Sequence, residues 1–193
     1  IEETPSCALT PELREEIGRQ AVLAAKTAGY WNAGTCEFMF KDGKYYFLEM
    51  NTRLQVEHPI TEQVTRTDLA REMLYVASGL ELSYAQEDIR QIGHCIEFRI
   101  NAEDPLNAFT PCPGKITRYA EAGGVGVRVD SGVYQGFTIP PFYDSMVAKL
   151  IVWGENRSYC IERSKRALWE MQVGGMRTNI PFHEVVLSHE AFV

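Results

Sequence analysis

The sequence lacks paired cysteines, an excess of basic residues and any long apolar run. Its five cysteines are odd in number and form no C-x-x-C pair, which argues against a disulfide framework or a zinc site and fits a reducing cytoplasm. The formal net charge of -7 argues against a nucleic-acid surface, because phosphate binding requires clustered Lys and Arg. No apolar stretch approaches the roughly 18 residues of a membrane span. We therefore expect a cytoplasmic globular protein with neither nucleic acid nor membrane as a partner.

The composition is that of an ordinary folded chain. With 45% hydrophobic and 23% charged residues among 193, the composition favours neither disorder nor a membrane protein, and one large or two small domains are expected. The first residue is Ile1 rather than Met, and the sequence begins among charged and proline-containing residues. We expect a fragment or a processed piece of a longer protein.

Local patterns predict two regions of different character. The first contains a helix over residues 10–28 that Thr10 can cap, and a hairpin of strands 35–40 and 45–50 around Asp42-Gly43. It also contains a helix over 69–77, for which Thr67 and Asp68 are the candidate caps. The second contains strands at 92–101, 116–119, 125–129 and 148–152, a helix over 158–171 and a short helical stretch after Pro181. This order predicts an α+β protein whose two domains span residues 1–84 and 85–193.

One segment, EMNTRLQVEH at residues 49–58, has polar side chains at every second position. If the chain stays extended there, these side chains point the same way. A three-residue hairpin loop at 41–43 would add Glu37 to the face of Glu49, whereas a two-residue loop would separate them; the pattern favours the shared face. The opposite, mostly apolar face would then hold Cys36, Phe38, Phe40, Tyr46, Leu48 and Met50.

Glu37, Glu49 and Asn51 are the kind of oxygen ligands that Mg²⁺ takes together with nucleotide phosphates. The alternative is the solvated face of an edge strand, where alternating polar residues are ordinary. In a later strand, Arg99 shares one face with Glu97 and Asn101, while Ile96, Phe98 and Ile100 fill the other face. A surface salt bridge is an equally good interpretation of Arg99. The four histidines are too scattered for a metal site, and we assign them no chemistry.

The segment EMNTRLQVEH, followed by proline, resembles the biotin carboxylase form of the metal-binding strand of ATP-grasp ligases. Further resemblances to the same family are GTCEF at 34–38, EFRINAEDP at 97–105, PGKIT at 113–117 and YDSM at 143–146. Together they cover essentially the whole chain. The resemblance implies the C-terminal half of an ATP-grasp domain at residues 1–84, followed by the β-rich biotin carboxylase C-terminal domain at 85–193.

The resemblance also implies which residues bind ATP and metal. The family's ligands for Mg²⁺, or Mn²⁺, correspond to Glu37, Glu49 and Asn51, the residues that the strand pattern selects independently. Glu37 and Glu49 would also face ATP. Met39 corresponds to an apolar position that touches adenine, although a methionine in the protein core is an equally good interpretation.

The same resemblance implies a reaction. Arg53, Gln55 and the backbone of Val56 would hold bicarbonate, and Glu57 would deprotonate it for attack on the γ-phosphate of ATP, giving carboxyphosphate. Arg99 would bind bicarbonate and stabilise the biotin oxygen that becomes negative when the ureido nitrogen loses its proton. The catalytic residues would thus be Arg53, Glu57 and Arg99.

The implied partners are a biotin carboxyl carrier protein or domain, which brings the biotin cofactor, a carboxyltransferase, and a second copy in a homodimer. The final acceptor, such as acetyl-CoA, propionyl-CoA or pyruvate, is left open because the carboxyltransferase selects it. The family's glycine-rich lid and phosphate-binding lysines correspond to sequence before Ile1, so we expect this piece alone to be incomplete. Two alternatives remain: a non-catalytic module for dimerisation or carrier docking, and an ATP-grasp ligase for another acid.

Overall fold

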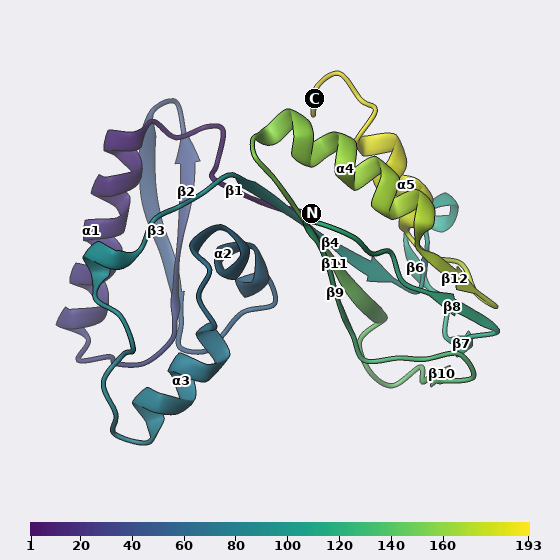
Figure 1. The fold of residues 1–193 in the computed structure, drawn as a ribbon, viewed down its shortest axis with the longest axis horizontal. Helices are drawn as coiled ribbons and strands as arrows, with labels where there is room; N and C mark the ends of the chain where they lie inside the picture. The colour runs from purple at the N-terminus through teal and green to yellow at the C-terminus, as the bar shows by residue number, and fades with distance from the viewer. The chain divides into compact units, whose positions relative to one another are not determined.

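A computed structural model describes all residues 1–193, and the chain divides into two compact units. The hairpin unit comprises residues 5–91, and the sheet unit comprises residues 1–4 and 92–193 (Figure 1). Helices and antiparallel strands occupy separate stretches of the chain, so the predicted α+β class is confirmed. The predicted domain boundary between residues 84 and 85 stays a prediction. No helix of the structure is long and apolar enough to cross a membrane.

Two helices of the hairpin unit begin where side-chain caps predict. Helix α1 (Pro11–Thr27) starts after Thr10, whose side chain accepts a hydrogen bond from the Leu13 amide at 3.3 Å. Helix α3 (Leu69–Ala77) starts after Asp68, which caps the Arg71 amide at 2.9 Å. Both predicted helices are confirmed. A third helix, α2 (His58–Thr65), was not expected.

The predicted hairpin is present, but its loop is shorter than expected. Strands β2 (Thr35–Lys41) and β3 (Lys44–Asn51) pair antiparallel, and Lys41 lies opposite Lys44. The loop is therefore the two residues Asp42 and Gly43, whose φ angles of 51° and 74° suit a tight hairpin turn. The prediction of a three-residue loop is wrong.

An irregularity in β3 nevertheless brings the two glutamates together. The pairing shifts by one residue next to Glu37, so that Phe38 lies opposite Phe47 while Glu37 lies opposite Glu49. Leu48 is the extra residue of this β-bulge, which changes the side-chain parity of β3. The shared face of the two glutamates is thus formed by a bulge in the strand and not by the turn.

The bulge also changes which aromatic residues share a face with Phe38. The Phe38 ring contacts the rings of Tyr45 and Phe47 edge to face, at centroid distances of 5.8 and 5.7 Å. Tyr46 and Leu48, which we expected on this apolar face, are exposed. That part of the prediction is wrong because the expected alternation assumed an uninterrupted strand.

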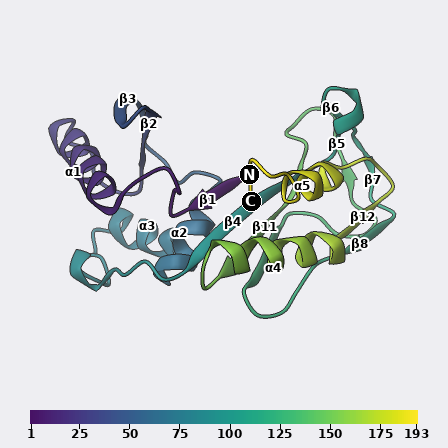
Figure 2. The ribbon, with the colours of Figure 1, turned by 90° about the horizontal axis from the view of Figure 1, so that it is seen from above.

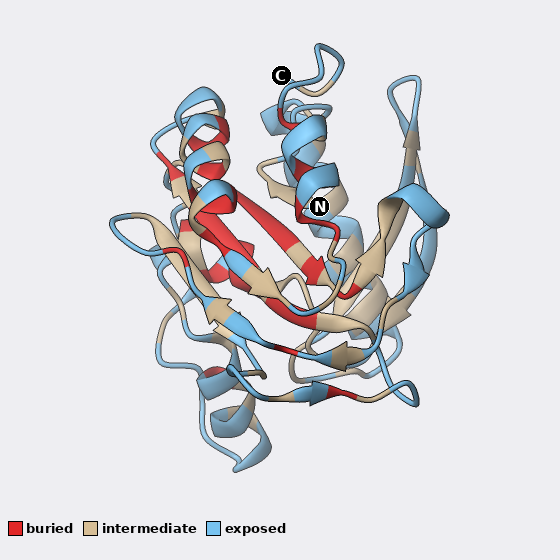
Figure 3. Ribbon diagram, turned by 90° about the vertical axis from the view of Figure 1, so that its right-hand side faces the viewer, coloured by how far each residue is buried: buried red, intermediate tan, exposed pale blue.

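The sheet unit is built on a four-stranded antiparallel sheet with the order β1-β4-β11-β9. The strands are β1 (Glu2–Thr4), β4 (His94–Asn101), β11 (Met146–Gly154) and β9 (Val127–Ser131). Helices α4 (Arg157–Glu170) and α5 (Ile180–Val186) pack on it, and Figure 3 shows the buried residues gathered along these central strands and helices. Ile96, Phe98 and Ile100 of β4 are fully buried, as their predicted common face requires.

Short elements complete the sheet unit. They are β5 (Glu103–Asp104), β6 (Thr110–Pro111), β7 (Gly114–Lys115), β8 (Arg118–Ala120), β10 (Thr138–Ile139), β12 (Gln172–Gly174) and a 3-10 helix, Pro105–Asn107. They pair as β5 with β6, β7 with β10, and β8 with β12, the last pair being visible in Figure 2. The hairpin unit has one further 3-10 helix, Gln86–Asp88.

Strand β1 joins the sheet unit although the rest of the N-terminal region belongs to the hairpin unit. Its Glu3 carboxylate lies 2.9 Å from Nε2 of His94 and 2.9 Å from Nε of Arg157. The hydrogen bond from His94, followed by that from Arg157, lowers the pKa of Glu3 to about 2 against the opposing effect of burial. This acid therefore links the first strand to β4 and α4, a connection that the sequence pattern did not suggest.

Candidate active site

Four polar side chains meet at the open end of the hairpin. Nδ2 of Asn51 lies 2.8 Å from Oε1 of Glu37 and 3.0 Å from Oε1 of Glu49. Nε2 of Gln55 donates to the same Glu37 oxygen at 2.7 Å. Two carboxylates on directly opposed residues repel each other, and two amide groups here donate hydrogen bonds to them. We call Glu37, Glu49, Asn51 and Gln55 the acidic cluster.

The donor set of the acidic cluster fits a hard divalent cation. Mg²⁺ prefers oxygen ligands and usually binds one or two protein carboxylates, with phosphates and water completing its shell. Rotation of the Asn51 amide would exchange its nitrogen for its oxygen and give a third oxygen ligand. Nowhere in the chain do three or more His, Cys, Asp or Glu side chains form a group that could hold a metal ion.

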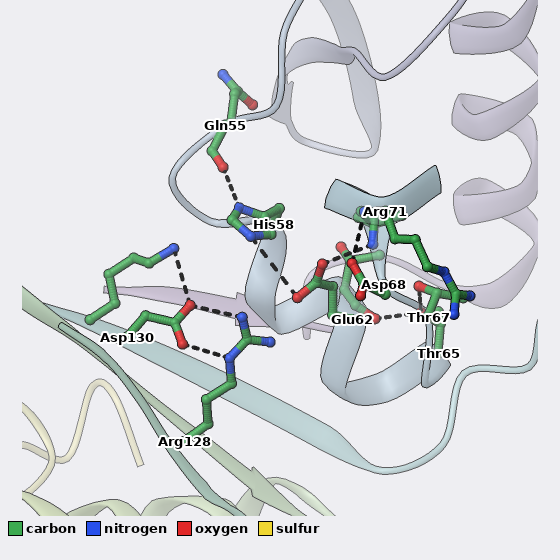
Figure 4. A network of polar contacts seen from close by, with 12 residues as sticks. Gln55, His58, Glu62, Thr65, Thr67, Asp68, Arg71, Arg128 and Asp130 are labelled. Atoms are coloured by element: carbon green, nitrogen blue, oxygen red, sulfur yellow. Dashed lines mark hydrogen bonds and ion pairs between the residues drawn. The ribbon is translucent and has the colours of Figure 1, made fainter. Parts of the chain in front are cut away.

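The chain does not remain extended after the acidic cluster. Strand β3 ends at Asn51, and residues 52–57 bend and turn into α2. The assumption that all five alternate side chains point one way is therefore wrong. The physical reason is the Gln55 carbonyl, which accepts from the His58 amide at 3.4 Å and lies 2.8 Å from Nδ1 of the same residue, closing the turn (Figure 4).

This turn places the remaining predicted residues at the start of α2. Glu57 is the N-cap residue of the helix, but its side chain makes no capping hydrogen bond, so its carboxylate is not used to cap α2. Val56 lies in the turn before it. The guanidinium of Arg53 contacts the carbonyl of its neighbour Leu54 at 3.4 Å. The structure thus gathers the four residues of the acidic cluster and leaves Arg53, Val56 and Glu57 on the segment that follows.

One histidine and one glutamate of α2 support the turn. The ring of His58 lies between the Gln55 carbonyl and the Glu62 carboxylate, with 4.0 Å between Nε2 and Oε2 (Figure 4). Glu62 is buried, and its Oε1 accepts from the Leu69 amide at 2.9 Å, next to the start of α3. Sequence reasoning assigned no role to His58. A signal existed in its spacing of four residues from Glu62, which places both on one face of a helix.

Met39 lies two residues after Glu37 on β2 and is 62% exposed. The alternative of a methionine packed in the core is therefore wrong for this chain. Its contact with adenine stays a prediction.

Arg99 lies on β4 in the sheet unit, whereas the acidic cluster lies in the hairpin unit. Its Nε is 2.7 Å from Oε1 of Glu2, so the ion pair that we considered exists, with the acid contributed by β1. Glu97 is fully buried on the same face of β4. The face is consequently no ordinary solvated surface, because buried carboxylates require compensation.

Neighbouring strands add more charge to this face. Lys149 of β11 lies directly opposite Arg99 on one side and Asp130 of β9 on the other. Asp130 binds Arg128 through two parallel contacts, Nε to Oδ1 at 2.7 Å and Nη2 to Oδ2 at 2.8 Å, and Lys149 approaches it at 3.7 Å (Figure 4). Sequence reasoning missed Lys149 because its alignment with Arg99 depends on strand pairing that no local pattern encodes.

Two cysteines of the sheet unit, Cys95 and Cys160, are buried in its core. Burial raises the pKa of Cys95 far above its ordinary value and that of Cys160 to about 12. Both thiols are therefore protonated and act as small apolar groups of the core.

Comparisons with known proteins identify relatives for both halves of the chain. The family of the biotin carboxylase C-terminal domain matches residues 97–193, and the family of the carbamoyl-phosphate synthase L chain ATP-binding domain matches residues 1–85. A pyruvate carboxylase subunit of Methanothermobacter thermautotrophicus is 60% identical over 192 residues, which cover 100% of this chain and 39% of the relative. Biotin carboxylase 1 of Bacillus subtilis is 55% identical over 195 residues, covering 100% and 43%.

A solved structure agrees with the whole fold. The biotin carboxylase domain of 2-oxoglutarate carboxylase from Hydrogenobacter thermophilus, a dimer in complex with MgADP, ADP and bicarbonate, matches with a TM-score of 0.96 and 46% identity. The match covers 98% of this chain and 42% of that domain. The chain thus spans about two fifths of the length of these relatives.

Proposed function

Because the chain belongs to the biotin carboxylase family, we propose that it is part of a ligase that uses ATP to carboxylate biotin with bicarbonate. The acidic cluster is the observation that carries this proposal. It holds two carboxylates and two amides within hydrogen-bonding distance of one another, at the positions that the family resemblance assigns to metal and bicarbonate binding.

Glu37, Glu49 and Asn51 would hold Mg²⁺ or Mn²⁺ with the phosphates of ATP, and Glu37, Glu49 and Met39 would line the nucleotide site. The cation would neutralise phosphate charge. This role explains why two carboxylates are kept side by side, since a cation converts their repulsion into binding energy.

Arg53, Gln55 and the backbone N–H of Val56 would hold bicarbonate. A guanidinium offers paired donors to a planar anion, and an anion held beside the γ-phosphate meets a smaller entropic barrier to reaction. Glu57 would take the bicarbonate proton as the oxygen forms its bond to the γ-phosphorus and ADP leaves, so that carboxyphosphate is formed. Glu57 is the N-cap residue of α2 and directly follows the segment that would hold bicarbonate.

Arg99 would contact bicarbonate and the ureido oxygen of biotin. Its ion pair with Glu2 limits the directions open to the guanidinium. A fixed donor directed at an oxygen that gains negative charge stabilises the transition state, because it needs no reorganisation during the reaction.

We further propose that residues 1–84 are the C-terminal half of an ATP-grasp domain and residues 85–193 the carboxylase C-terminal domain. The family matches to 1–85 and 97–193 support this division. A carrier protein or domain would bring biotin, a carboxyltransferase would use the product, and the intact enzyme would form a homodimer, as the solved relative from H. thermophilus does.

The test uses the full-length enzyme with free biotin and measures ADP release. We expect Glu49→Gln to raise the Mg²⁺ concentration needed for half-maximal activity, and Arg99→Ala to abolish biotin-dependent ADP release while MgATP still binds. Glu87→Gln, an exposed glutamate in the same unit as Glu49, is the matched control and should behave as the parent. Normal biotin carboxylation in Arg99→Ala would contradict the role of Arg99.

The same measurements separate the two alternatives. A module that only docks a carrier or a second copy needs no nucleotide, so absence of MgATP binding by the full-length protein would favour it. A ligase for another acid would bind MgATP but release no additional ADP when biotin is added.

A further inference from the structure

The backbone of β4 changes partners next to Arg99. Strand β1 pairs with residues 95–97 of β4, and Glu2 lies opposite Glu97. Two residues further on, the edge of β4 is occupied by Asn179, the residue that precedes α5. The side chain of Asn179 thus binds the backbone of β4 beside the residues that pair with β1.

Asn179 makes three hydrogen bonds to this edge. Its Oδ1 accepts from the Asn101 amide at 2.9 Å, and its own amide donates to the Asn101 carbonyl at 3.1 Å. Its Nδ2 donates to the Arg99 carbonyl at 3.0 Å. Asn179 is 6% exposed, so water cannot readily replace these bonds.

A second side chain from α5 binds the same carbonyl. Nε2 of His183 lies 3.1 Å from the Arg99 oxygen, and the ring packs edge to face on Phe98 at a centroid distance of 5.4 Å. Burial lowers the pKa of His183 to about 4, so the ring is neutral near pH 7. Since a carbonyl can only accept, the single ring proton lies on Nε2.

We propose that Asn179 and His183 are positioning residues for Arg99. Together they give both acceptor positions of the Arg99 carbonyl a buried donor, which fixes the peptide plane from which the Arg99 side chain leaves the sheet. The ion pair with Glu2 then limits the guanidinium at its other end. The inference deepens the proposed function and rests on it, because it matters for catalysis only if Arg99 binds the substrates.

The first test is Asn179→Asp in the full-length enzyme. This change keeps the oxygen that accepts from the Asn101 amide but replaces the donor to Arg99 with a second oxygen. We expect kcat with biotin to fall and KM for bicarbonate to rise, together by about tenfold, while KM for MgATP stays the same. Asn156→Asp is the matched control: Asn156 caps α4 in the same unit through its side-chain oxygen, which aspartate retains, and it should leave all three constants unchanged.

The second test compares His183→Gln with His183→Leu. Glutamine retains a neutral donor for the Arg99 carbonyl, whereas leucine keeps only the packing volume. We expect His183→Leu to raise KM for bicarbonate and His183→Gln to keep it near the value of the parent enzyme. A purely structural role predicts instead that both variants lower the melting temperature and the amount of active enzyme without changing either KM. If Asn179→Asp does not fold, the comparison of His183→Gln with His183→Leu still tests the proposal.

Arg99→Ala, measured in parallel, distinguishes failure of the proposed function from failure of the positioning role. If Arg99→Ala carboxylates biotin normally, the proposed function of Arg99 fails. If Arg99→Ala is inactive but Asn179→Asp folds and keeps its KM for bicarbonate, or if glutamine at 183 is no better than leucine, the positioning role alone is overturned.

Discussion

The sheet unit and the hairpin unit differ in how far they bury their apolar residues. In the sheet unit, the core-facing residues of β4 and β11 are buried, and Phe98 and Leu150 among them have no exposed surface. In the hairpin unit, Ile60 and Val64 of α2 are the only buried hydrophobic residues, and α1 buries none. The acidic cluster therefore belongs to the lightly packed unit and Arg99 to the tightly packed one. Local stability follows buried apolar contact, so the two sets of proposed site residues should respond differently to mutation.

Truncation of one aromatic residue in each unit should give the largest difference. Phe98→Ala should destabilise the sheet unit by roughly 3 to 5 kcal/mol, because it leaves a cavity in a fully buried core. Phe47→Ala removes a ring that is 54% exposed, so we expect about 1 kcal/mol or less in the hairpin unit. Hydrogen exchange read by mass spectrometry reports each unit separately. Equal losses of protection would contradict the comparison.

Between pH 6.5 and 4, the loss of stability on acidification should also be confined to the sheet unit. The pKa of His183 falls from 6.5 to about 4 on folding. Between these two pH values the unfolded chain binds a proton at His183 and the folded chain does not. Stability should therefore be full above pH 6.5 and fall as the pH is lowered toward 4, by roughly 3 kcal/mol at about 1.36 kcal/mol per pH unit.

Glu3 separates this effect from a second one at lower pH. Its pKa is lowered from 4.5 to about 2, so its contribution is present above pH 4.5 and is lost as the pH falls toward 2. Urea unfolding at several pH values should show the upper window flattened in His183→Gln and the lower window retained. A parent-like slope between pH 6.5 and 4 in that variant would show that another group titrates there.

The acidic cluster should show the opposite relation between stability and function. Glu49→Gln removes one of two directly opposed carboxylates and should stabilise the hairpin unit, without added cation, by about 0.5 kcal/mol. In the full-length enzyme the same change should weaken Mg²⁺ binding. Glu87→Gln is again the control, and its melting temperature should not move. Destabilisation by Glu49→Gln would mean that the hydrogen bond from Asn51 outweighs the repulsion.

Local signals in the sequence predicted most of the elements. Caps at Thr10 and Asp68 marked the starts of α1 and α3, and alternation marked β4, because these features involve only neighbouring residues. Strand β1 was missed because three residues carry no periodicity, and it forms only by pairing with β4. Asn179 and His183 were missed for a related reason: their contacts to β4 join residues 78 to 84 positions apart.

The candidate site was predicted partly through a wrong intermediate step. Glu37 and Glu49 are opposed, as expected, but the expected route was a longer turn. No local pattern distinguishes an extra residue in the turn from an extra residue in the strand, because both change the parity of side chains by one. The turn chemistry of Asp42-Gly43 was the stronger signal for a two-residue loop.

The smallest predicted effect on stability tests the register of β2 and β3 directly. Deletion of Leu48 would convert the bulge into regular pairing and still leave Glu49 opposite Glu37 and Phe47 opposite Phe38, since Leu48 is the one residue of β3 without a partner in β2. Because its side chain is exposed, the stability of the hairpin unit should change by less than about 0.5 kcal/mol. Leu48→Ala, which keeps the bulge, is the matched control. Both variants of the full-length enzyme should retain Mg²⁺ binding, measured by titration. Loss of binding on deletion alone would mean that the extra twist of the bulge, and not the pairing of the two glutamates, sets the geometry of the acidic cluster.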